Sequence, residues 1–176
     1  MVEAATSEIV ACIALGSNLG DPLAQIGQAW TDLANLPQSR LTDCSSLYRS
    51  KPVGFTEQPD FINAAAIIVT QLSPRALLVE LLRIEARHGR NRTFKNAPRS
   101  LDLDLLLYDG LVMHEPGLTL PHPRMIERAF VLAPLAEIAA DLTIPGHGRV
   151  ADCLARLDQH GIHRLPPEPM RAAGRP

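Results

Sequence analysis

The sequence LDLDLLLY at residues 101–108 constrains the fold more than any other stretch. Successive side chains of a strand point to opposite faces, so Asp102 and Asp104 share one face of the predicted strand and the leucines between them point to the other. The leucine run at 105–107 then continues without alternation, which is typical of a strand covered on both faces. The sequence therefore predicts a strand that is covered on both faces for half its length and carries two carboxylates, with Cα atoms ~7 Å apart, on one face.

Two interpretations of these carboxylates stay open at this point. They face solvent from an edge strand, or they bind hard cations, because two close carboxylates are unfavourable unless they are neutralised. Basic side chains precede the strand at Arg90, Arg92, Lys95 and Arg99. Carboxylates that hold magnesium, together with arginines, are the groups with which proteins handle polyphosphates.

Composition excludes several classes of protein. With 176 residues and a formal net charge of −2, the chain fits one domain without a global basic field for nucleic acid or an anionic membrane. Its cysteines are widely spaced and form no Cys-x-x-Cys pair, which argues against a disulfide framework or a cysteine zinc site. The first residues lack the pattern of a signal peptide, and no apolar run approaches the roughly 18 residues of a membrane span. We therefore expect a cytoplasmic protein that binds neither nucleic acid nor membrane.

Hydrophobic periodicity and helix-capping residues predict the order of the elements. Asp21 and Ser73, each followed by proline, mark the starts of two helices. The predicted elements are a strand at 8–15, a helix at 22–36, strands at 40–50 and 61–72, a helix at 74–89, the strand with the two aspartates, and a helical stretch at 125–140.

This order predicts a ferredoxin-like α+β fold, in which two helices cover one face of an antiparallel sheet. The stretch at 125–140 is expected to cover part of the other face, which gives three layers, α-β-α. We predict a single domain over residues 1–164. Residues 165–176 are rich in proline and poor in large apolar side chains, so we expect a disordered tail.

Other motifs receive simpler interpretations. GSNLGD at 16–21 matches neither G-x-G-x-x-G nor a Walker A loop, so we interpret it as a tight turn into the helix. His88 and the other scattered histidines are most simply surface residues. His122 differs from them because flanking prolines hold it in a stiff extended segment near the possible site.

The chain resembles the 6-hydroxymethyl-7,8-dihydropterin pyrophosphokinase family. Five blocks carry the resemblance: ALGSNLGDP at 14–22, QPDFINAA at 58–65, RIEARHGRNR at 83–92, KNAPRSLDLDLLLY at 95–108 and LTLPHPRMIERAFVLAPLAEIAADL at 118–142. The resemblance implies an enzyme of folate biosynthesis that moves the terminal diphosphate of ATP onto the hydroxymethyl oxygen of the pterin and releases AMP.

The resemblance also implies roles for individual residues. Asp102 and Asp104 would hold two magnesium ions that bridge the ATP phosphates, and Arg90, Arg92 and Arg99 would be the catalytic arginines. The other implied contacts are Ser50, Val53, Phe61, Asn63 and Phe130 for the pterin, and Glu85, Leu105, Leu118, Thr119, His122 and Arg128 for ATP. The expected partners are these small-molecule substrates alone, and we expect a monomer.

Two rival functions follow from the same residues. One is another magnesium-dependent phosphotransferase with a different acceptor. The other is a ferredoxin-like RNA-binding or regulatory module, in which the basic residues at 90–99 contact phosphates and the aspartates face solvent. Such a module would bind RNA without magnesium and with a steep salt dependence.

Overall fold

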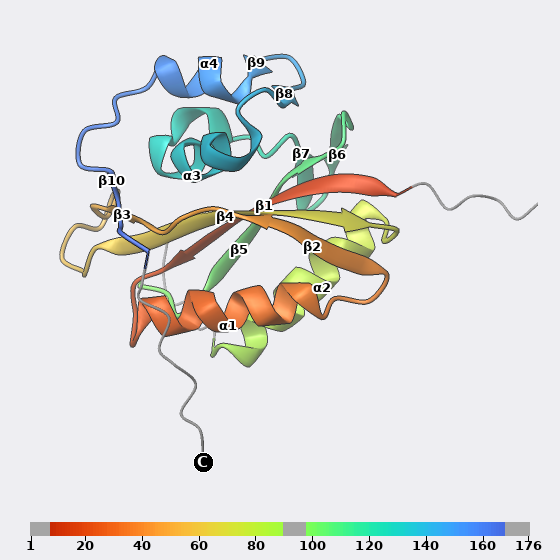
Figure 1. Cartoon of the computed structure of the whole chain (residues 1–176). Coiled ribbons are helices and arrows are strands. Elements are labelled where there is room, and N and C mark those ends of the chain that lie inside the picture. The colour runs from red at the N-terminus through yellow and green to blue at the C-terminus, as the bar shows by residue number, and fades with distance from the viewer. Residues whose placement is uncertain (1–7, 90–97, 168–176) are drawn as a thin grey trace, which may run out of the picture.

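The computed structural model describes residues 8–89 and 98–167 and places helices on both faces of a main antiparallel sheet (Figure 1). In chain order the elements are β1 (Ile9–Ser17), α1 (Pro22–Ala34), β2 (Ser39–Cys44), β3 (Tyr48–Ser50), β4 (Phe61–Thr70), α2 (Pro74–Arg87), β5 (Asp102–Tyr108), β6 (Met113–Glu115), β7 (Leu118–Leu120), a 3-10 turn (Met125–Glu127), α3 (Ala129–Ala139), β8 (Thr143–Ile144), β9 (Gly148–Arg149), α4 (Val150–Ala155) and β10 (His163–Arg164).

The main sheet has the strand order β10-β3-β4-β1-β5, and β2 pairs with the far end of β4. All of its pairings are antiparallel. Helices α1 and α2 cover one face, and α3 and α4 lie on the other (Figure 1). The predicted three-layer α+β fold is therefore confirmed.

The two main helices begin where their capping residues predict. The Asp21 carboxylate accepts a hydrogen bond from the Ala24 amide at 3.1 Å, and the Ser73 hydroxyl accepts one from the Ala76 amide at 3.2 Å. Proline follows each cap, where its missing N–H costs nothing because the first helical amides have no intrahelical partner. The capping residues therefore set where both helices begin.

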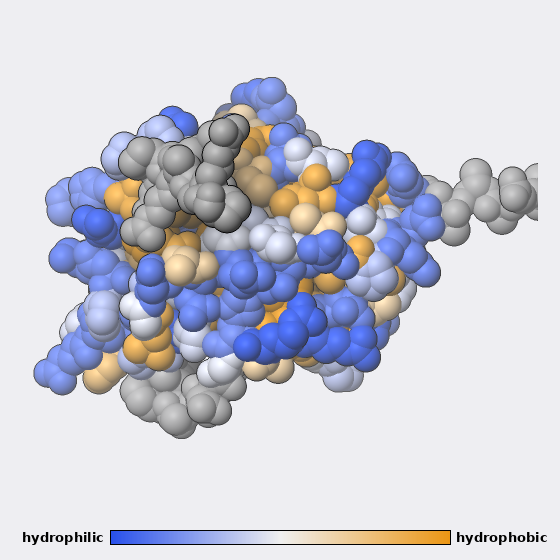
Figure 2. Space-filling view, turned by 60° about the horizontal axis from the view of Figure 1, so that its bottom comes forward, coloured by the Kyte–Doolittle hydropathy of each residue, from blue (hydrophilic) through white to orange (hydrophobic). Residues whose placement is uncertain are grey.

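The core on the α1/α2 face is continuous and apolar. Leu33 of α1 and Leu81 of α2 are fully buried in one cluster with the side chains of β1, β4 and β5 that point to this face. That cluster includes Leu101, Leu103 and Leu105, which alternate with the two aspartates. The outer surface of this layer is mostly hydrophilic, with scattered smaller apolar areas (Figure 2).

A second core cluster lies between the sheet and α3. It contains Leu132 and Leu135 of α3 together with Leu106 and Leu107 of β5. The register between β1 and β5 shifts between Cys12 and Ile13, which places two consecutive leucines of β5 in this one cluster. The leucine run therefore has cover on both faces of the sheet, as predicted.

Three local predictions differ from the structure. The strand predicted at 40–50 is divided into β2 and β3, because the Ser45 hydroxyl accepts the hydrogen bond from the Ala65 amide and the Ser46 amide donates to Glu137 instead of to β4. The helix predicted at 125–140 is a 3-10 turn followed by α3. The short elements β6, β8, β9, α4 and β10 had no predicted counterpart.

The prediction of a surface position for His88 is wrong. Its side chain is only 7% exposed, and its ring nitrogens contact Gln25 Oε1 at 2.6 Å and Asp32 Oδ2 at 2.8 Å. Both partners belong to α1, so the contact joins the end of α2 to its neighbouring helix. Sequence periodicity could not reveal partners so distant along the chain.

The first residue of the predicted tail is attached to the sheet. The Leu165 amide donates a hydrogen bond to the Leu47 carbonyl at 2.8 Å, and its side chain packs against the core. Residues 168–176 lie outside the described part of the chain. Among the described residues, no helix is both long and apolar enough to cross a membrane.

Candidate active site

The two aspartates lie side by side on β5, as the strand geometry predicted. In the antiparallel pairing with β1, Asp102 lies opposite Gly16 and Asp104 lies opposite Ala14. Directly opposed side chains lie on the same face of a sheet, and these two partners are small. The carboxylates therefore open onto free space on the α3 face instead of being covered.

That space is a pocket, walled by the sheet on one side and by the start of α3 on the other. It brings together segments that are distant in the sequence. Of the predicted site residues, those that line it are Ser50, Val53, Phe61, Asn63, Arg99, Asp102, Asp104, Arg128 and Phe130.

A second pocket lies on the other side of Asp104. It is lined by Glu85, Leu105, Leu118, Thr119 and His122, which are all of the predicted ATP contacts except Arg128. Asp104 lines both pockets. The two predicted substrate sites therefore meet at a carboxylate of the aspartate pair.

The charges around the aspartates partly balance them. Arg99 Nη1 donates to Asp102 Oδ2 at 2.5 Å. Burial raises the pKa of Asp104, and the charge of Asp102 raises it further, whereas His122, Arg128 and Arg99 act in the opposite direction. The site thus favours additional positive charge next to Asp104.

His122 is held as a neutral ring at the edge of the second pocket. Burial lowers its pKa, Arg128 and Arg124 act in the same direction, and Asp104 opposes them. Its Nδ1 accepts a hydrogen bond from the Arg124 amide at 3.2 Å, which leaves the proton of the neutral ring on Nε2. His122 is therefore arranged as a hydrogen-bond donor.

The pocket floor next to the aspartates is polar and its sides are aromatic. Asn63 Nδ2 donates to Ser50 Oγ at 2.7 Å, and both side chains are buried. Phe61 and Phe130 line the same pocket from β4 and α3, and the Arg128 guanidinium lies 5.7 Å from the centre of the Phe130 ring. This combination suits a flat, polar heteroaromatic molecule.

Glu85 is buried in α2 at 1% exposure. Its Oε1 accepts a hydrogen bond from the Leu103 amide at 2.7 Å. It therefore joins α2 to β5 beside the second pocket. Its assignment as an ATP contact stays a prediction.

Sequence reasoning missed Asn18 and Arg124. Asn18 Oδ1 accepts from the Arg99 amide at 2.9 Å, and its Nδ2 donates to Gln58 Oε1 at 2.8 Å and to the Pro59 carbonyl at 3.0 Å. The GSNLGD turn, confirmed as a turn with Gly20 at a φ of 65°, thus fixes the position of Arg99. The position of an asparagine directly after a strand was the available signal.

Arg124 lines the first pocket from the segment after His122. Its neighbours in the sequence, Pro123 and Met125, gave no sign that it lines this pocket. Arg90 and Arg92, the other two predicted catalytic arginines, lie outside the described residues.

Residues 12–140 match the model of a protein family described as 7,8-dihydro-6-hydroxymethylpterin-pyrophosphokinase (HPPK). The chain belongs to the HPPK family. An HPPK-family relative named 2-amino-4-hydroxy-6-hydroxymethyldihydropteridine pyrophosphokinase, from Haemophilus influenzae, is 43% identical over 159 residues, which cover 90% of this chain and 99% of the relative. A relative of the same name from Methylorubrum extorquens is 46% identical over 155 residues, covering 88% of this chain and 98% of the relative.

Solved structures of HPPK proteins share the fold. The crystal structure of wild-type Plasmodium falciparum HPPK-DHPS superposes with a TM-score of 0.68 at 12% identity, over 85% of this chain and 43% of that one. The chain therefore spans less than half the length of that larger protein. None of these relatives supports the alternative of an RNA-binding or regulatory module.

Proposed function

We propose that this protein transfers the terminal diphosphate of ATP to the hydroxymethyl group of 6-hydroxymethyl-7,8-dihydropterin and releases AMP, as a step of folate biosynthesis. Membership of the HPPK family and the names of its relatives support this reaction. The observation that carries it is the position of Asp104, which lines both pockets. A donor in one pocket and an acceptor in the other would have their reacting ends at the same carboxylate.

The donor atoms of the site fit magnesium. Carboxylates are the ligands that this cation prefers, and Mg²⁺ at phosphate-transfer sites usually takes one or two carboxylates and completes its shell with substrate phosphates and water. No group of three or more His, Cys, Asp or Glu side chains gathers as a metal site within the described residues. The site we propose would accordingly be completed by the substrate: Asp102 and Asp104 would hold two Mg²⁺ ions when ATP is bound. The ions would neutralise the phosphate oxygens and hold the transferred group.

The pterin would occupy the first pocket. Phe61 and Phe130 would stack on its ring, because aromatic faces gain energy from offset packing. Asn63 and Ser50 would orient the ring by hydrogen bonds in its plane, and Val53 would cover the outer edge. The hydroxymethyl group would then point toward Asp104.

ATP would occupy the second pocket. Leu105 and Leu118 would pack against the nucleoside, and Thr119 and Glu85 would contribute polar contacts. His122 Nε2 would donate to a phosphate oxygen. Arg128, and Arg90 and Arg92 from outside the described residues, would add positive charge.

The proposed transfer needs no strong base, because it depends on how the reacting groups are positioned. In phosphoryl transfer the nucleophile and the leaving oxygen must lie in line with phosphorus, and charge on the other oxygens must be stabilised. Arg99 is fixed at its backbone by Asn18 and at its side chain by Asp102, so its charge is already in place before the substrates bind.

We further propose that residues 1–164 form one domain, to which Leu165 is joined by the hydrogen bond from its amide to the Leu47 carbonyl. The protein would act as a monomer in the cytoplasm. Sedimentation equilibrium with and without substrates tests the oligomeric state.

The decisive test of the reaction is AMP formation from ATP and Mg²⁺, with and without 6-hydroxymethyl-7,8-dihydropterin. We expect AMP only when the pterin is present, and an Asp102→Asn variant that still folds should lose it. Formation of ADP, or AMP release independent of the pterin, would contradict the proposed acceptor.

A further inference from the structure

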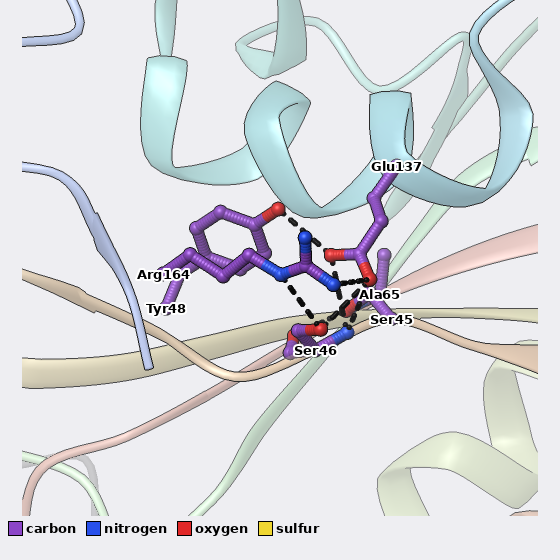
Figure 3. Close-up of polar contacts among 6 residues, drawn as sticks. All are labelled: Ser45, Ser46, Tyr48, Ala65, Glu137 and Arg164. Carbon is purple, nitrogen blue, oxygen red and sulfur yellow. Dashed lines mark hydrogen bonds and ion pairs between the residues drawn. The ribbon is translucent and has the colours of Figure 1, made fainter. Parts of the chain in front are cut away.

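Glu137, near the end of α3, is the centre of a polar network on the same face of the sheet as the first pocket. Its carboxylate accepts hydrogen bonds from the Ser46 amide at 3.1 and 3.2 Å, the Ser46 hydroxyl at 2.8 Å and the Tyr48 hydroxyl at 2.7 Å. Arg164 Nη2 donates to it at 3.2 Å, and Arg164 Nε donates to Ser46 Oγ at 3.0 Å. Figure 3 shows Glu137 reaching from α3 to all three partners. We call these four residues the Glu137 network.

The network joins three separate segments of the chain. Glu137 belongs to α3, Ser46 lies just before β3, whose first residue is Tyr48, and Arg164 belongs to β10. Backbone pairing reinforces the last contact, since Arg164 lies opposite Tyr48 in the ladder between β10 and β3. The family match ends at residue 140, so it gives Arg164 no role.

Tyr48 is an immediate neighbour of the polar pocket floor. It lies opposite Asn63 in the ladder between β3 and β4, and it precedes Ser50 by two residues on the same face of β3. Ser50 in turn lies opposite Phe61. The strand segment that the network holds is therefore the one that carries the Asn63–Ser50 hydrogen bond.

The opposite wall of the pocket belongs to the same helix as Glu137. Phe130 precedes Glu137 by two helical turns and so lies on the same side of α3. Pro134 lies between them and cannot donate to the Phe130 carbonyl, which removes one backbone hydrogen bond from this part of the helix. Side-chain contacts with the sheet therefore matter more for the placement of α3.

The charges of the network suit a permanent anchor. Burial opposes ionisation of Glu137, but the hydrogen bonds from Tyr48 and Ser46 and the charge of Arg164 lower its pKa overall. Burial and the bond to Glu137 raise the pKa of Tyr48 to about 12, so its hydroxyl remains a donor at neutral pH.

We propose that the Glu137 network is a positioning element of the pterin site, in which Arg164 of the C-terminal segment helps to set the distance between Phe130 on α3 and the Asn63–Ser50 pair on the sheet. A flat ring held between two walls binds well only at one separation, since packing attraction falls steeply with a gap of 0.5–1 Å. The inference rests on the proposed function, because it assumes that the first pocket takes the pterin. No member of the network would contact the nucleotide.

The test compares Glu137→Gln, Arg164→Gln and the mild Tyr48→Phe with a matched control, Arg149→Gln. Arg149 also lies in the C-terminal segment, but its ion pairs with Asp141 and Asp152 are exposed and it does not line either pocket. The dissociation constant of 6-hydroxymethyl-7,8-dihydropterin is measured by fluorescence titration with Mg²⁺ and α,β-methylene-ATP present, and that of the ATP analogue is measured separately.

We expect Glu137→Gln and Arg164→Gln to weaken pterin binding about 5- to 10-fold and Tyr48→Phe about 2- to 5-fold, with binding of the ATP analogue changed less than about 2-fold. Arg149→Gln should bind both ligands as the unaltered protein does. Variants that melt at lower temperature yet bind the pterin normally would overturn the inference and leave the proposed function standing. If the unaltered protein binds the analogue but no pterin, the proposed function fails and the inference with it.

Discussion

On the α1/α2 face the sheet is covered by leucine and isoleucine side chains along its length, whereas on the α3 face the cover ends where β5 carries its two aspartates. The first face buries apolar area without interruption, and such area is the main source of folding free energy. The second face leaves small residues opposite the carboxylates and a pocket above them. One face of the sheet therefore supplies stability and the other carries the candidate site. This separation is possible because a strand points alternate side chains to opposite sides.

If the faces are separate in this way, Asp104→Asn should have the largest effect on activity and little on stability. Loss of the carboxylate shared by both pockets is expected to reduce kcat on the order of 10²- to 10³-fold. The free energy of unfolding should stay the same or rise, because the buried carboxylate next to Asp102 is disfavoured in its charged form. AMP release and urea unfolding measure the two quantities. A stable variant with activity within about twofold of normal would contradict the assignment of activity to the α3 face.

Leu81→Ala tests the other face. Leu81 is fully buried in α2, and its truncation should lower the free energy of unfolding by about 2–5 kcal/mol. The activity of each folded molecule should not change, because Leu81 lines neither pocket. Val79→Ala, at a position of α2 that is 41% exposed, is the control and should cost about 0.5 kcal/mol or less. Equal losses at both positions in urea unfolding would contradict a continuous core here.

Asn63→Ala tests whether the two pockets bind different substrates. Removal of the amide should raise the KM for the pterin roughly tenfold, since its proposed hydrogen bonds to the ring and its hydrogen bond to Ser50 are lost. The KM for ATP should be unaffected, because Asn63 does not line the second pocket. Steady-state kinetics with each substrate varied in turn gives both constants. An equal rise in both would show that the two pockets do not separate the substrates.

The smallest expected effect is a pH dependence of the stability that the Glu137 network contributes. The folded state lowers the pKa of Glu137 from its ordinary value of 4.5, so its stabilising contribution is present above that value and is lost as the pH falls through the lower folded pKa. The difference in Tm between the unaltered protein and Glu137→Gln should therefore be larger at pH 7 than in strongly acidic buffer. A difference that grows on acidification would have the wrong sign and would exclude an ionised Glu137 as the anchor.

The sequence was sufficient wherever a pattern is local. Alternation identified the face shared by Asp102 and Asp104, and Asp21 and Ser73 identified the helix starts. The resemblance then named residues of both pockets that lie far apart in the chain. Their roles remain predictions that the kinetic tests address.

The structure added what depends on contacts between distant segments. The division of the strand predicted at 40–50 depends on Ser46 bonding to Glu137, and the burial of His88 depends on two side chains of α1. Short elements such as β10 contain too few residues to show a period. In each case the partner is remote, and no local pattern in the sequence shows which remote residues meet.

The contacts at the two edges of the main sheet also bear on self-association of the protein. Exposed strand edges offer unpaired amides and carbonyls to other chains and are sites of aggregation. Strand β10 covers β3 at one edge, and Glu85 occupies the Leu103 amide of β5 at the other. A chain cut before His163 would uncover β3, so loss of these few residues should appear as concentration-dependent precipitation.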